Sequence, residues 1–185
     1  FGDGKLDIKN SGLIKSGTET GAVGIFLNNN SGAAKLDIKL DLANGVINLK
    51  DSENAVGVYV DKGTVTDNAS TITVGKNGIA FYAKDSDVTL NGTTINLFGD
   101  NALGLYLDSP SSFTGTGNIN IDGQNAVLFN IVSSGVTITN NFTLGTVTSC
   151  STYSIGHITE GEIEYTGNTV LGNNGTMMAG INSAI

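Results

Sequence analysis

Asn54-Ala-Val-Gly-Val-Tyr-Val60 is the first of four seven-residue segments that align without gaps and decide the fold. The other three are Asn77-Gly-Ile-Ala-Phe-Tyr-Ala83, Asn101-Ala-Leu-Gly-Leu-Tyr-Leu107 and Asn125-Ala-Val-Leu-Phe-Asn-Ile131. Their starts lie 23, 24 and 24 residues apart. An earlier copy begins at Gly21, and a degenerate one begins at Tyr153. A fixed period of this length is typical of a solenoid, in which each repeat forms one coil and stacks on its neighbours.

Two further short segments with alternating apolar and polar residues lie between successive copies. The first column consists of Val65, Val88, Phe113 and Val136, and the second begins at Ile72, Ile95, Ile119 and Phe142. Each period therefore holds three short strands separated by Gly, Asn, Asp and Ser turns. A β-sandwich would not keep such a repeat in phase over four cycles. We predict an all-β protein, a right-handed parallel β-helix with three short strands and about 24 residues per coil.

Strict alternation along the seven-residue segments assigns a face to each position. It predicts that two apolar columns point inward: Val56, Ile79, Leu103 and Val127, and Val58, Phe81, Leu105 and Phe129. It also predicts an outward strip of small residues: Ala55, Gly57, Gly78, Ala80, Ala102, Gly104 and Ala126.

An aromatic column lies beside this strip and is predicted to point outward. Its members are Phe26, Tyr59, Tyr82 and Tyr106. Tyr provides a large contact area with little loss of entropy on binding, so these four residues are the candidate ligand-binding site. The alternative is that stacked rings simply stabilise the sheet through cross-strand pairs.

An asparagine precedes the third strand in each of four coils, at Asn54, Asn77, Asn101 and Asn125. Asn tolerates the left-handed conformation of tight turns, and its amide can bond the equivalent Asn one coil away. We interpret this column as a structural turn ladder. The whole chain, 1–185, is expected to be one β-helical segment of a longer passenger, less regular at 1–50 and 145–185.

Composition and charge exclude several classes of function. The chain has nine Lys and Arg together, 17 Asp and Glu, and a net charge of −8, and residues 85–185 contain no Lys or Arg. A nucleic-acid partner would require a basic surface, so none is expected. No apolar run is long enough to span a membrane, and no direct membrane insertion is expected. The lone Cys150 cannot form an internal disulfide.

Few residues are candidates for chemistry. His157 is the only histidine, and it aligns with the Val58 column; we interpret it as brought to the surface by a local register change, or as filling the end of a coil. No Cys/His spacing suggests zinc, and Asp85-Ser-Asp87 is interpreted as a solvated turn rather than a calcium site, so no metal or cofactor is expected. The alternating Glu160-Gly-Glu162-Ile-Glu164 is interpreted as a solvated edge.

Two other patterns point to activities that we regard as minor alternatives. Asp100 and Asp122 occupy similar turns one coil apart and could mimic the carboxylate pair of a polysaccharide-degrading enzyme, although no Arg completes such a site. The threonine column Thr66, Thr89, Thr114 and Thr137 is too narrow for an ice-binding plane. No catalytic residues are assigned, and the chain is not expected to be an enzyme.

The copies at 54–60, 77–83 and 101–107, with an Asn-rich and Arg-free composition, resemble the passenger domains of type V autotransporters. The likeness is to the very large fusobacterial outer-membrane adhesins, the RadD-like and galactose-inhibitable adhesins, and it covers about residues 21–131 best. The resemblance implies display on the cell surface, anchored in the bacterial outer membrane through a barrel outside this segment. It also implies adhesion, with a host cell-surface protein such as an inhibitory immune receptor, or a galactose-type glycan, as partner.

Two hypotheses for the function of the rod therefore stand beside the minor alternative of a polysaccharide-degrading enzyme. In the first, this segment attaches the bacterium to host cells or to other bacteria through its exposed face. In the second, it is a structural stalk of the adhesin and binding occurs elsewhere. A binding rod and a spacer rod need the same core, so the repeat does not decide between them.

Overall fold

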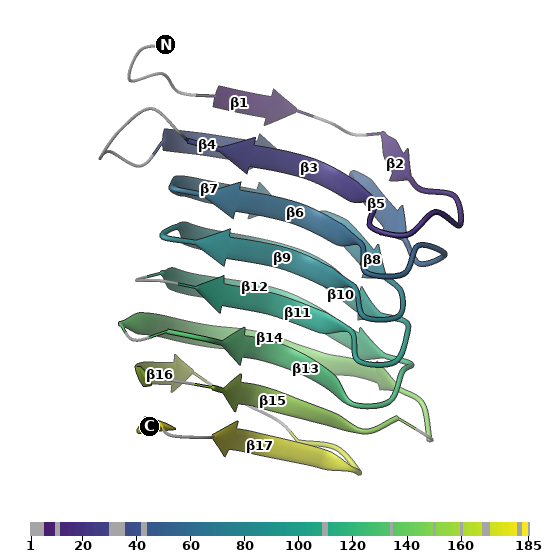
Figure 1. Ribbon diagram of the computed structural model, residues 1–185, viewed down its shortest axis with the longest axis vertical. Helices are drawn as coiled ribbons and strands as arrows, with labels where there is room; N and C mark the ends of the chain where they lie inside the picture. Colours follow the sequence, from purple (N-terminus) through teal and green to yellow (C-terminus); the bar gives the residue numbers. More distant parts are fainter. Residues whose placement is uncertain are drawn as a thin grey trace.

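The computed structural model describes residues 6–9, 12–29, 36–41, 44–108, 111–133, 135–149, 151–159, 161–167, 171–180 and 183–184. All regular secondary structure in these ranges is β-strand, and Figure 1 shows the strands stacked in coils from the N-terminus to the C-terminus. Two sheets face each other across the interior of the stack.

The seven-stranded sheet contains the third strand of each coil. Its order is β17-β15-β13-β11-β9-β6-β3. The strands are β3 (Val23–Asn28), β6 (Val56–Asp61), β9 (Ile79–Lys84), β11 (Leu103–Asp108), β13 (Ala126–Ile131), β15 (Tyr153–Ile158) and β17 (Gly175–Gly180).

The eleven-stranded sheet contains the other two strands of each coil. Its main path is β1 (Leu6–Lys9), β4 (Leu36–Asp41), β7 (Gly63–Asn68), β10 (Asp87–Leu97), β12 (Ser112–Ile121), β14 (Val136–Val147), β16 (Gly161–Gly167) and β18 (Ser183–Ala184). Beside it run β2 (Leu13–Lys15), β5 (Val46–Leu49) and β8 (Thr71–Val74).

Every strand pair joins equivalent strands of successive coils in parallel. Tyr59 lies opposite Tyr82, and Tyr82 lies opposite Tyr106, which are steps of 23 and 24 residues. Such long parallel connections require each coil to close around the core before the next begins. The predicted parallel β-helix is thus confirmed.

The first two strands of a coil merge along the rod. In the earlier coil they are separate, as β7 and β8, and β10 pairs with both of them. A bulge between Asn91 and Thr93, where Gly92 has φ of 72°, lets β10 turn the corner without breaking. The prediction of three strands per coil therefore applies to the earlier coils, and later coils have one long strand in place of the first two.

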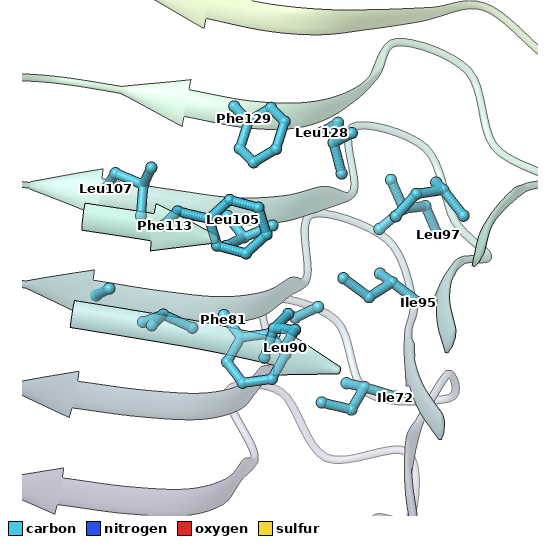
Figure 2. Packing of buried hydrophobic residues seen from close by; sticks show 14 of the residues in the cluster. Ile72, Phe81, Leu90, Ile95, Leu97, Leu105, Leu107, Phe113, Leu128 and Phe129 are labelled. Atoms are coloured by element: carbon cyan, nitrogen blue, oxygen red, sulfur yellow. The ribbon is translucent and has the colours of Figure 1, made fainter. Parts of the chain in front are cut away.

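The core consists of apolar ladders contributed by both sheets (Figure 2). Val58, Phe81, Leu105 and Phe129 have no exposed surface, as predicted. Phe113 packs against Phe129 with ring centroids 5.1 Å apart. Gly115 makes room for the rings of Phe113 and Phe142, since a Cβ at this position would lie 2.3 Å from the first ring and 2.5 Å from the second.

The predicted strip of small residues is inside the protein rather than outside. Ala55, Ala80, Ala102 and Ala126 have no exposed surface. A Cβ on Gly57 would lie 2.6 Å from the carbonyl oxygen of Ala80 and 2.8 Å from Cγ2 of Ile72, so this position also faces the core. The column of Val56, Ile79, Leu103 and Val127 is correspondingly only half-buried, on the outer face. The interior beside Ile72 has room only for small residues, and alternation changes phase at Gly57 and Val58, which both point inward.

The predicted columns slip by two residues in β14. Phe113 pairs with Ile138 rather than Val136, and Thr114 pairs with Thr139 rather than Thr137. Ile119 likewise pairs with Leu144 rather than Phe142. The longer step is already present at Ser112 and Thr137, the first pair of β12 with β14, so it arises in the connection before β14, and the register shift between Ile119 and Ile121 comes only afterwards. Alignment at a fixed period of 23–24 residues does not allow for such a longer coil.

Candidate functional site

The outer face of the seven-stranded sheet carries three ladders of side chains in register. The aliphatic ladder contains Val23, Val56, Ile79, Leu103 and Val127. The aromatic ladder contains Phe26, Tyr59, Tyr82 and Tyr106. The charged rim contains Asp61, Lys84 and Asp108. All three belong to strands β3 to β13, whose inner faces are fixed by the core.

The four rings of the aromatic ladder stack on one another along the rod. Ring centroids are 4.8 Å apart for Phe26 and Tyr59, 4.9 Å for Tyr59 and Tyr82, and 4.7 Å for Tyr82 and Tyr106. The planes diverge by only 10–16°. The spacing equals that of paired strands, so the backbone of the β-helix sets the stack.

Stacking determines which part of each ring a ligand can reach. The faces of Tyr59 and Tyr82 are covered by their neighbours on both sides. Ring edges and hydroxyl groups remain toward solvent, with each ring half-buried except Phe26, which is 62% exposed. A sugar that stacks on an aromatic ring needs a free face, whereas a protein surface can pack against edges.

The hydroxyls of Tyr82 and Tyr106 are held in their protonated, donating form. Burial, and then the negative charge of Asp108, raises the pKa of Tyr82 to about 12. The same two causes raise the pKa of Tyr106. The ladder thus presents a row of O–H groups in a negative local potential, at intervals of about 4.8 Å.

The aromatic ladder ends after Tyr106. The next two positions in register are Asn130 and His157, which place Nδ1 of His157 3.3 Å from Oδ1 of Asn130. A shallow hollow of about 740 Å³, lined in part by Val127, Ser154 and His157, begins there. The expected local register change at His157 is confirmed: β15 is shifted by one residue from the alignment with the Val58 column, and the imidazole lies on the outer face beside Asn130.

The asparagine column forms the turns that lead into this sheet. Asn54, Asn77, Asn101 and Asn125 all have φ between 53° and 56°. Nδ2 of Asn101 donates to Oδ1 of Asn77 at 3.2 Å, and Nδ2 of Asn125 lies 3.5 Å from Oδ1 of Asn101. These bonds link the side-chain amides of Asn77, Asn101 and Asn125 along the rod, as a turn ladder requires.

The two carboxylates proposed as a catalytic pair do not share a column. Asn101 N donates to the carbonyl of Gln124, and Gln124 N donates to Oδ1 of Asp100 at 2.9 Å, so Asp100 lies beside Gln124. Asp122 N instead donates to the carbonyl of Leu97, which places Asp122 next to Phe98 in register. Asp100 therefore serves as a turn acceptor, and the two carboxylates are not stacked in register one coil apart.

Several other candidates also have defined places. Asp87 accepts a hydrogen bond from Ser112 at 2.6 Å on the outer face of the eleven-stranded sheet. The threonine column runs Thr66, Thr89, Thr114, Thr139 and Thr166. Within the described ranges no group of three or more His, Cys, Asp or Glu side chains could hold a metal ion. Cys150 and Glu160, and the side chains of Glu162 and Glu164, lie outside what the structure describes.

Sequence reasoning missed two features. Asp67 is fully buried, with Oδ2 accepting from Ser70 at 2.5 Å and Thr93 at 2.7 Å, and burial raises its pKa. It occupies the column that contains Leu90 in the next coil, where alternation marks an inward position. Phe98 is 49% exposed beside a trough of about 340 Å³ that follows Thr73, Asn96 and Asn120.

Comparison with protein-family models, with curated proteins and with solved structures finds no match for this chain. No helix long and apolar enough to cross a membrane occurs in the part of the chain that the structure describes.

Proposed function

We propose that this chain is a segment of a bacterial cell-surface adhesin that attaches the cell by contact with a protein on a host cell or another bacterium. One observation carries the proposal: the aliphatic and aromatic ladders lie side by side on one outer face. Apolar residues that are regularly placed on a surface are typical of interaction sites. The autotransporter resemblance supports display on the outer membrane.

A protein partner suits this face better than a sugar does. The stacked rings expose edges and O–H groups, and the aliphatic ladder beside them offers a continuous apolar strip. Such a surface fits a partner with its own apolar side chains and carbonyl acceptors. A galactose-type glycan would have to use the hollow beyond Tyr106, where Asn130 and His157 replace the rings.

The stalk is the second candidate. Its support is the regular turn ladder and the absence of interruption in the core from β6 to β13. A rod that only spaces needs no outward apolar ladders, and the aliphatic ladder therefore favours the adhesive role.

Binding of the purified 185-residue chain to epithelial and lymphoid cells tests the proposal. We expect saturable binding that free galactose leaves unchanged. A variant with Tyr59, Tyr82 and Tyr106 all replaced by Ser should lose at least tenfold in affinity. The matched control replaces Thr66, Thr89 and Thr114 by Ser, which alters three stacked outward residues of the other sheet and should bind normally.

Three outcomes would count against this account in different ways. No binding by a folded sample favours the stalk. Binding that galactose abolishes points to a glycan. Full binding by the triple Tyr variant places the contact surface elsewhere on the rod.

A further inference from the structure

The aromatic ladder has a defined centre. It spans four adjacent strands, β3, β6, β9 and β11, and its midpoint lies between β6 and β9. The aliphatic ladder runs beside it over the same four strands. Val23 and Phe26 at one end are 46% and 62% exposed, so this apolar surface is accessible to a partner.

The charged rim beside the rings alternates in sign. Asp61 pairs in register with Lys84, and Lys84 pairs in register with Asp108. Asp61, Lys84 and Asp108 are each partly exposed, so these alternating charges can meet the side chains of a partner.

We propose that the face formed by the three ladders binds a second copy of the same chain, with the two rods antiparallel and a two-fold axis between β6 and β9. This rests on the proposed function, because it names the partner of the same adhesive face. In this arrangement Tyr59 of one copy faces Tyr82 of the other, and Phe26 faces Tyr106. Asp61 of each copy faces Lys84 of the other.

The chemistry of the face selects this arrangement over its alternatives. Parallel rods related by a two-fold axis along the rod keep every strand at the height of its own copy, so wherever the two charged rims met, Asp61 would oppose Asp61 and Lys84 would oppose Lys84. Antiparallel rods centred on β9 would bring Lys84 against Lys84 and Asp61 against Asp108, which are repulsive pairs. Only a centre between neighbouring strands joins opposite charges, and the centre between β6 and β9 also overlays all four rings.

The size of the face sets the strength of the contact. Four strands at about 4.8 Å and six residues at about 3.3 Å give roughly 400 Å² per copy. This is about half the area that one partner contributes to a stable interface. We therefore expect a weak, reversible dimer, with half-association between about 10 µM and 1 mM. Rods held at high local concentration on facing cells would multiply such contacts.

Sedimentation equilibrium of the 185-residue chain tests the pairing. The weight-average mass should rise from 19.0 kDa toward twice that value as the concentration increases to about 1 mM. Lys84→Glu places two acids opposite each other and should weaken association at least tenfold. The double variant Asp61→Lys, Lys84→Glu reverses both charges and should restore it.

The charge reversal separates this face from any other route of association. Association that is indifferent to Lys84→Glu, or that the double variant does not restore, overturns the pairing. A mass that stays at 19.0 kDa throughout also overturns it. Cell binding by a chain that stays monomeric leaves the proposed function standing and refutes only the self-pairing. Self-association without cell binding limits the adhesive role to contact between like cells.

Discussion

Replacing Gly57 by Ala distinguishes the observed orientation of the third strand from the alternating one. In the structure a Cβ at this position would lie 2.6 Å from the carbonyl oxygen of Ala80, 2.8 Å from Cγ2 of Ile72 and 3.4 Å from the Ala80 carbonyl carbon. The first contact is with backbone in the next coil, so rotation of a side chain cannot relieve it. Overpacking of this kind costs about 1–3 kcal/mol in the free energy of unfolding.

If Gly57 pointed outward, Gly57→Ala would raise the free energy of unfolding instead of lowering it. Ala in an exposed strand position is favoured over Gly by about 0.5–1 kcal/mol, because Gly loses more backbone freedom on folding. Gly57 does not have a positive φ, so Ala incurs no backbone strain there. The two orientations therefore predict free-energy changes that differ by at least about 1.5 kcal/mol.

Urea denaturation followed by far-UV circular dichroism measures this difference. We expect a lower midpoint for Gly57→Ala with an unchanged slope. Val56→Ala is the neighbouring control: Val56 is only half-buried on the outer face, so the variant should lose about 1 kcal/mol or less. A Gly57→Ala protein as stable as the parent, or more stable, would refute the inward assignment of the small residues.

The other predictions concern the turn ladder and the buried acid. Asn77 has φ of 53° and accepts from Asn101, so Asn77→Ala should lose about 1–2 kcal/mol in a urea titration, while Asn77→Gly should recover most of that loss. Equal stability of the two variants would contradict the conformational explanation. The pKa of Asp67 is raised by burial above 3.8, so its folded form holds a proton more tightly than the unfolded chain does. The proton on Asp67 stabilises the fold fully when the pH is below the pKa of Asp67 in the unfolded chain. This stabilisation is lost as the pH rises through the higher pKa of Asp67 in the folded protein. Asp67→Asn should therefore be more stable than the parent at pH 7, and the advantage should shrink on acidification; an advantage that is constant with pH would contradict the assignment.

The repeat itself was readable from the sequence because an apolar core must recur once per coil. Phe81, Leu105 and Phe129 are spaced by one period and are buried, and the aromatic column from Phe26 to Tyr106 stacks on the outer face. The asparagine turns were also evident, since few residues tolerate a left-handed turn.

The face of the first half of each third strand could not be read from alternation. Gly57 and Val58 both point inward, and a rule of period two assigns one of them to solvent. Volume was the missing information: Ala and Gly in this column indicate a crowded interior beside Ile72, which becomes evident only when the two sheets are brought together. The outer face therefore differs from the prediction: a ladder of Val, Ile and Leu side chains lies where a strip of Ala and Gly was expected.

The predicted alignment of the later coils was wrong for a different reason. The connections between strands differ in length from coil to coil, so Ile138 takes the place expected for Val136, and His157 pairs with Asn130 on the outer face. Register shifts such as those at Gly92 and between Ile119 and Ile121 also change the coil length along a strand, which a fixed repeat length does not encode.

Oxidative footprinting of the chain bound to cells tests the central claim most directly. Hydroxyl radicals modify exposed aromatic rings, and mass spectrometry reads each ring separately. The adhesive-face account predicts that Tyr59, Tyr82 and Tyr106 become protected on binding, while Phe98 on the other side of the rod remains as reactive as in the free chain. Protection of Phe98 with all three tyrosines still reactive would contradict it.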